Sequence, residues 1–110
     1  MDVNLYAELA QKILKEKANY KPANPNVEIQ TVFDTENNRY LMLHVGWRRE
    51  SRVYGCVVHI EIKKGKIWIQ QDGTEDGVAN DFIAAGVPKQ DIVIGWHYPP
   101  MRKHTEFAVG

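Results

Sequence analysis

The chain has 110 residues, and its 14 Lys and Arg balance 14 Asp and Glu, so the formal net charge is zero. This length suits a single domain, residues 1–110, and 44% hydrophobic residues suffice for one core. A protein that neutralises many phosphates is basic, so the composition argues against a DNA-coating role. The single cysteine excludes an internal disulfide and predicts a reducing, cytoplasmic setting. No apolar run is long enough for a membrane span.

The N-terminal segment predicts an amphipathic helix over residues 2–20. Leu5, Leu9 and Ile13 recur at helical spacing, and charged side chains fill the opposite side. Pro22 and Pro25 then end the helix and form a short extended link.

Residues 27–71 change to a period of two, which is typical of strands. Segments rich in β-branched and aromatic residues cover 27–35, 39–47, 53–63 and 66–71. Turn signals between them, such as Asn37-Asn38 and Lys64-Gly65, predict an antiparallel meander.

Alternation along these strands predicts the two faces of the sheet. The expected core face carries Leu41, Leu43, Val45, Trp47, Cys56, Val58, Ile60, Ile62, Ile67 and Ile69. The other face is neither cleanly polar nor cleanly apolar, and it carries Tyr40, Met42, His44, Val57, His59, Glu61, Trp68 and Gln70. A mixed face of this kind is what a partner protein, or a second copy of the chain, covers.

A second helix is predicted after residue 72. Asp72 or Thr74 can cap its start, and Gly86 is a good C-terminal cap. Its buried stripe is Val78, Phe82 and Ile83. Residues 91–95 predict a short strand or extended segment, and an irregular tail follows. The fold class is therefore α+β, with an N-terminal helix, an antiparallel meander of four or more strands, and a second helix packed on the sheet.

Two turns concentrate basic residues, although the chain as a whole is neutral. One carries Arg48, Arg49 and Arg52, and the other carries Lys63, Lys64 and Lys66. They are either solvated turns or a basic edge that contacts nucleic acid or an acidic partner. The second interpretation makes the chain a sequence-tolerant DNA-binding module.

The residues that could carry catalysis or bind a metal form only weak patterns. His44 and His59 fall on one predicted face with Glu61, so a metal site is conceivable, but no ligand spacing supports it. Glu61 and Lys63 match the E-x-K step of metal-dependent nucleases, with Asp34 as the second acid, and this is the least favoured function. Cys56 is expected in the core, where a thiol is inert. The sequence thus predicts no enzyme, no cofactor and no metal site.

The chain resembles the XisI family of cyanobacterial proteins, the excision controlling factors of the fdxN element. The matching segments begin with "VGW" at 45–47, "RVYGC" at 52–56 and "GKIWIQQ" at 65–71. They continue with "GVP" at 86–88, "IV" at 92–93 and the tail residues His97, Pro99, Pro100, Arg102, Thr105, Phe107 and Ala108. The resemblance covers nearly the whole chain and is densest from residue 45 onward.

The resemblance implies a role in programmed excision of a DNA element during heterocyst development. The family acts there with a recombinase and with XisH, a partner whose fold is nuclease-like. No catalytic residue is transferred, so a non-enzymatic accessory factor is expected; restraint of the nuclease-like partner is compatible with this role. A homo-oligomer and DNA contact, direct or through the partner, are further candidates. The predicted partner surface joins the mixed face to the tail through His44, His59, Trp68, Gln70, His97, Arg102 and Phe107.

Overall fold

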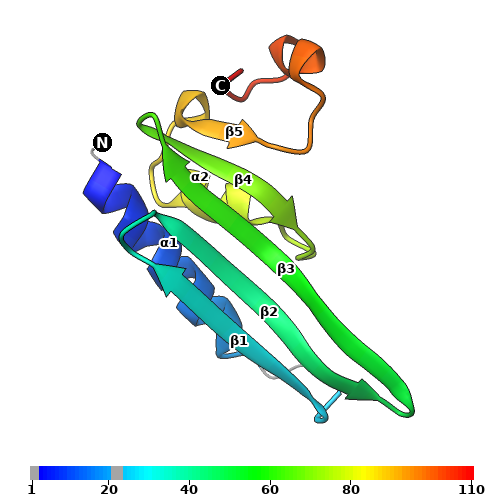
Figure 1. Ribbon diagram of the computed structural model, residues 1–110. Helices are drawn as coiled ribbons and strands as arrows, with labels where there is room; N and C mark the ends of the chain where they lie inside the picture. The colour runs from blue at the N-terminus through cyan, green and yellow to red at the C-terminus, as the bar shows by residue number, and fades with distance from the viewer. Residues whose placement is uncertain (1–2, 21–23) are drawn as a thin grey trace.

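The computed structural model describes residues 3–20 and 24–110. Its first element is the helix α1 (Val3–Ala18), which lies behind the sheet in Figure 1. The predicted N-terminal helix is confirmed, while residue 2 and Pro22 lie outside the described ranges. The side of α1 that is buried against the sheet carries Tyr6, Ala10, Ile13 and Leu14.

In the described part of the chain, five strands form one sheet in the order β1-β2-β3-β4-β5. The first four are β1 (Val27–Asp34), β2 (Arg39–Arg48), β3 (Ser51–Lys63) and β4 (Lys66–Asp72). They pair antiparallel, as the meander predicts, and Lys64 and Gly65 both adopt positive φ in the β3–β4 turn. The short strand β5 (Ile92–Ile94) adds to β4 in parallel.

The second helix, α2 (Val78–Ala84), lies on the same side of the sheet as α1. Gly77 occupies the N-cap position, and the side chain of Asp72 caps the helix from further upstream, because its Oδ2 accepts a hydrogen bond from the backbone N–H of Val78 at 2.7 Å. The helix ends at Ala84, and Gly86 follows it with a φ of +99°, while the N–H of Val87 bonds the carbonyl of Phe82. Gly86 therefore matches the sequence prediction, whereas the predicted N-cap residue, Asp72 or Thr74, is wrong because the helix begins later in the chain.

A β-bulge decides which face of β2 is buried. Leu43 lies opposite Cys56, but Met42 lies opposite Val58, so Val57 is an extra residue in β3. The extra residue exchanges the two faces of β3, so Val58 lies on the helix side and Cys56 on the open side, and the whole of β2 faces the opposite way from the prediction. Tyr40 and Met42 are buried beneath the helices, at 0% and 3% exposure.

The predicted core face is therefore wrong for β2 and for Cys56. Cys56 is exposed, and Trp47 is 49% exposed. The prediction is correct for β4 and for the part of β3 beyond the bulge, where the buried residues are Val58, Ile60, Ile62, Ile67 and Ile69. No helix in residues 3–20 or 24–110 is long and apolar enough to cross a membrane.

Candidate protein-interaction surface

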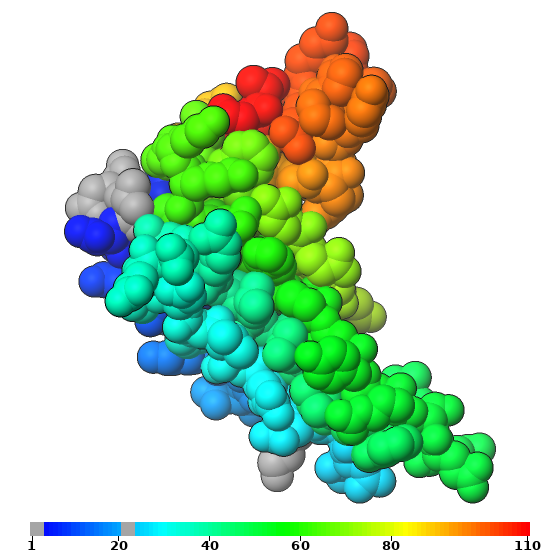
Figure 2. All heavy atoms as spheres, viewed as in Figure 1, coloured from blue at the N-terminus to red at the C-terminus, as the bar shows by residue number. Residues whose placement is uncertain are grey.

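The side of the sheet turned away from α1 and α2 is here called the open face. Figures 1 and 2 look onto it, with both helices behind the strands. One half of the open face, from Leu41 to the β2–β3 turn, is here called the apolar half. Its apolar residues are Val32, Leu41, Leu43, Val45, Trp47, Tyr54 and Cys56, with Glu28, Gln30 and Arg52 on the same face among them. Val32 is 46% exposed and Tyr54 is 71% exposed. Exposed apolar side chains gathered on one face are typical of a protein-binding surface.

Charged groups gather around Glu61 in the other half of the open face. Its carboxylate accepts a hydrogen bond from Gln70 at 2.8 Å and lies 3.1 Å from Arg39 Nε. His59 Nε2 and Lys63 Nζ lie 3.7 and 3.9 Å from the same carboxylate. Burial alone would raise the pKa of Glu61, but the Gln70 hydrogen bond and the neighbouring cations outweigh it and lower the pKa. Glu61 is therefore ionised at neutral pH.

The neighbourhood of Glu61 does not form the predicted nuclease centre. Asp34 lies opposite Arg39, and Arg39 lies opposite Glu61, so the guanidinium stands between the two acids. Asp34 instead accepts hydrogen bonds from Glu36 and Asn37 in the β1–β2 turn. Two carboxylates separated by an arginine cannot share one divalent ion.

Trp68 connects the Glu61 cluster to the C-terminal segment. Lys63 Nζ lies 4.1 Å from the centroid of its ring, and the Arg102 guanidinium lies 5.4 Å from it. Arg102 also donates to the carbonyl oxygens of His97 at 3.1 Å and Gly95 at 3.2 Å. One arginine thus holds the short 3₁₀ helix η2 (Pro99–His104), here called the C-terminal turn, against the open face.

Two buried polar atoms of the open face lack a hydrogen bond within the described chain. They are Nε2 of His59 and Nε1 of Trp68. His59 Nε2 lies 3.7 Å from the Glu61 carboxylate, so its nearest charged neighbour belongs to the same cluster.

The structure brings together some of the predicted partner-binding residues and separates others. His59, Trp68, Gln70 and Arg102 meet on the open face. His97 packs edge-on against the exposed Trp96, with ring centroids 5.9 Å apart. Phe107 packs against the hydrophobic core and is only partly exposed.

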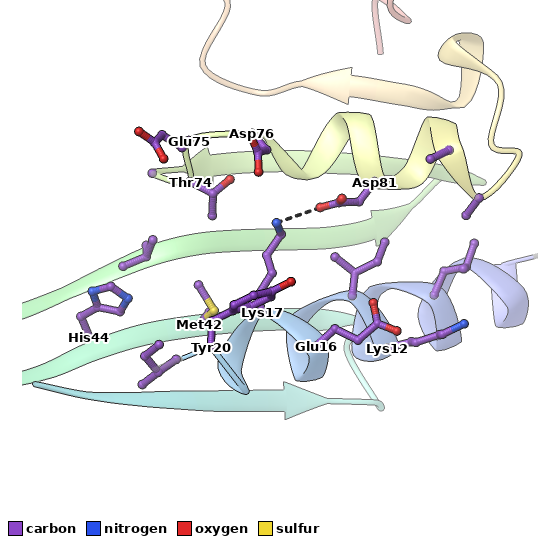
Figure 3. A pocket seen from close by; sticks show the side chains of 17 residues that line it. Lys12, Glu16, Lys17, Tyr20, Met42, His44, Thr74, Glu75, Asp76 and Asp81 are labelled. Carbon is purple, nitrogen blue, oxygen red and sulfur yellow. Dashed lines mark ion pairs between the residues drawn. The ribbon is translucent and has the colours of Figure 1, made fainter. Parts of the chain in front are cut away.

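His44 lies on the helix side of the sheet, away from His59. It lines the end of a groove of about 800 Å³ between α1 and α2. In Figure 3 the groove is crossed by the ion pair of Lys17 and Asp81, whose charged atoms are 2.9 Å apart. The expected shared face for the two histidines is therefore wrong. In the described ranges, no three His, Cys, Asp or Glu side chains gather as metal ligands.

Sequence reasoning missed the apolar half of the open face because it assigned most of these residues to the core, namely Leu41, Leu43, Val45, Trp47 and Cys56. The exposed Cys56 thiol donates to the carbonyl of Val58 at 3.2 Å, and desolvation raises its pKa. It is therefore protonated at neutral pH and poorly suited to act as a nucleophile.

The two basic turns lie at opposite ends of β3. This strand has 13 residues, which at the usual rise per residue spans about 40 Å. The arginine turn sits at the tip of a projecting hairpin at the lower right of Figure 2. The lysine turn lies beside β5, so the two turns do not form one basic patch.

Comparison with known proteins gives a match over nearly the full length. The family model described as XisI protein matches residues 1–109. The chain belongs to the XisI family. Among proteins with curated descriptions, none matches it.

Two solved XisI structures have the same fold. One is a XisI-like protein from Anabaena variabilis, which is 40% identical, with a TM-score of 0.91 over 98% of this chain and 99% of that one. The other is the fdxN element excision controlling factor XisI from Anabaena variabilis, which is 32% identical, with a TM-score of 0.83 over 98% of each chain. The α+β fold expected from the sequence is thus confirmed.

Proposed function

We propose that this XisI-family chain is a non-enzymatic accessory factor for programmed excision of a DNA element, and that it works in the cytoplasm. Membership of the family supports this proposal, as does full-length similarity to a protein described as an excision controlling factor. The chain acts by binding a XisH-type, nuclease-like partner.

The observation that carries the proposal is the open face. It combines exposed apolar residues, including Trp47 and Tyr54, with an ionic cluster in which Arg39 and Lys63 surround Glu61. Protein interfaces join an apolar centre to a polar rim in this way. A DNA surface would instead need many cations, whereas Glu61 neutralises much of the charge around it.

The partner surface comprises the open face and the adjoining C-terminal turn. Trp68 and Arg102 are its central contacts, and Trp47 belongs to its apolar half. Aromatic residues and arginine are the side chains that most often dominate binding energy at interfaces.

Co-purification with a XisH-type protein tests the proposal. Trp68→Ala and Trp47→Ala are expected to weaken capture of the partner about tenfold or more while leaving the chain folded. Arg102→Ala is expected to act in the same direction. Tyr20→Ala is the matched control, because Tyr20 is 77% exposed and follows α1 on the helix side of the sheet. Unchanged capture by all three open-face variants would contradict the placement.

The complex is then assayed for DNA cleavage against each protein alone. A change in the nuclease activity of the partner on binding supports a controlling role and gives its direction. Cleavage by this chain alone, abolished by Glu61→Gln, would contradict the non-enzymatic assignment.

DNA binding through the arginine turn is the alternative function. Arg48, Arg49 and Arg52 cluster at the tip of a projecting hairpin, where they are exposed. Binding of this kind would weaken steeply with salt, because each neutralised phosphate releases counterions.

A further inference from the structure

The strand β3 extends well beyond its neighbour β4. The two strands pair only over residues 58–63 of β3, whereas β2 pairs with β3 from Ser51 onward. In the described chain, a single backbone hydrogen bond reaches residues 51–57 from the β4 side, from Gly73 N–H to the carbonyl of Val57. Residues 51–56 therefore present a free strand edge, visible as the lower part of β3 in Figure 1.

This free edge is well suited to pair with another strand. Residues 51–56 contain a valine and a tyrosine, one charged residue and no proline. Exposed edges are usually blocked by lysines, prolines or a covering segment, because their unpaired N–H and C=O groups attract other strands. Here only Arg52 offers such protection, and its guanidinium lies over the Trp47 ring at 5.3 Å.

We propose that the free edge of β3 binds the same edge of a second copy of this chain, forming a two-fold symmetric dimer. Antiparallel pairing over residues 52–56, which stops short of the bond between Gly73 and Val57, places Val53 of one copy opposite Gly55 of the other. Tyr54 then meets its own counterpart at the two-fold axis, and Arg52 lies opposite Cys56. No like charges face each other, and aromatic residues are favourable cross-strand neighbours.

Charge complementarity favours a second copy as the occupant of this edge. In the antiparallel arrangement, the arginine turn of each copy reaches the end of β4 of the other copy. The segment that follows β4 carries the exposed acids Glu75 and Asp76, and the turn carries the exposed Arg48 and Arg49. Opposite charges thus meet twice, once on each side of the axis.

The dimer joins the two open faces into one surface. The strands of the second copy continue the sheet of the first, and the two-fold axis runs through the sheet, so both open faces point the same way. Trp47 and Tyr54 of both copies then lie on one apolar surface. The dimer itself requires no XisH-type protein, so its test is independent of the proposed function.

Sedimentation or light scattering of the chain alone tests the dimer. At tens of micromolar, the wild-type protein is expected to have twice the 12.7 kDa mass of the chain. Tyr54→Lys brings two positive charges together at the axis and is expected to weaken the dimer about tenfold or more. Tyr20→Lys is the control, because Tyr20 is 77% exposed and Tyr54 is 71% exposed.

A cross-link tests the register directly. In a Cys56→Ser background, Tyr54→Cys is expected to form a covalent dimer under mild oxidation, because residue 54 lies opposite itself. Tyr20→Cys in the same background is expected to stay monomeric on denaturing gels. A monomeric wild-type protein would overturn the proposal, as would a dimer that resists Tyr54→Lys and is not cross-linked through residue 54.

Discussion

Met42 lies opposite Val58 in the sheet, although the β2–β3 turn by itself would place Met42 opposite Val57. The extra residue in β3 turns Met42 toward the helices, where it is 3% exposed. Leu43, the next residue of β2, faces outward, and the bulge places Cys56 beside it in the apolar half of the open face. A single bulge thus separates the core of this protein from its candidate binding surface.

Substitutions on either side of β2 test this face assignment. Met42→Lys buries an unpaired charge and is expected to cost about 3 kcal/mol or more of unfolding free energy. Leu43→Lys points to solvent from the open face and is expected to cost about 1 kcal/mol or less. Urea unfolding of both variants measures the difference, and a larger loss for Leu43→Lys would refute the assignment.

The cap of α2 gives a second prediction. Asp72→Ala removes the oxygen that accepts from Val78 N–H and is expected to cost about 1 kcal/mol of unfolding free energy. Asp76→Ala is the control, because the hydrogen bond from Asn80 reaches the backbone carbonyl of Asp76 and not its carboxylate. Thermal unfolding compares the two variants, and equal losses would show that Asp72 is not the cap.

The cluster around Glu61 predicts a dependence of stability on pH. The pKa of Glu61 is lower in the folded chain than its ordinary value, so the folded state favours the ionised carboxylate. Its contribution to stability is complete above the ordinary glutamate pKa, about 4.3, and is lost as pH falls through the lower folded pKa.

The difference in stability between wild type and Glu61→Gln is therefore expected to be constant near neutral pH and to shrink below about pH 4.3. Urea unfolding at a series of pH values measures it. Glu36→Gln serves as the control, since Glu36 is an exposed residue of the β1–β2 turn. A difference that grows as the solution becomes more acidic would contradict the lowered pKa.

Arg102 gives a prediction about the C-terminal turn. Arg102→Gln removes the charge over Trp68 and shortens the side chain that bonds Gly95 and His97. Faster hydrogen exchange is expected in residues 99–108, with little change in β2. Lys103→Gln is the control at a neighbouring exposed position. Equal exchange in the two variants would mean that Arg102 does not hold the turn.

Local signals in the sequence predicted much of the fold. The spacing of apolar residues predicted α1, and Gly86 predicted the C-terminal end of α2, because these features depend on residues close together in the chain. The start of α2 was harder to place, since Gly77 and not Asp72 or Thr74 occupies the N-cap position. The sequence Lys64-Gly65 likewise predicted the β3–β4 turn, where both residues adopt positive φ.

The candidate site was harder to predict because it depends on register and on distant contacts. Nothing in the local alternation of β3 reveals that Val57 is an extra residue, so the faces of His44 and Cys56 were assigned incorrectly. Trp68 and Arg102 were both named from the sequence, but their contact joins segments 34 positions apart and requires the folded C-terminal turn.

The most direct test of the open face as the partner surface is oxidative footprinting of the chain with and without a XisH-type protein. Trp47 and Trp68 are expected to become protected from oxidation in the complex, while Tyr20 keeps its reactivity. Protection of Tyr20 and of the groove between α1 and α2, with unchanged reactivity at both tryptophans, would place the partner on the opposite side and contradict the account.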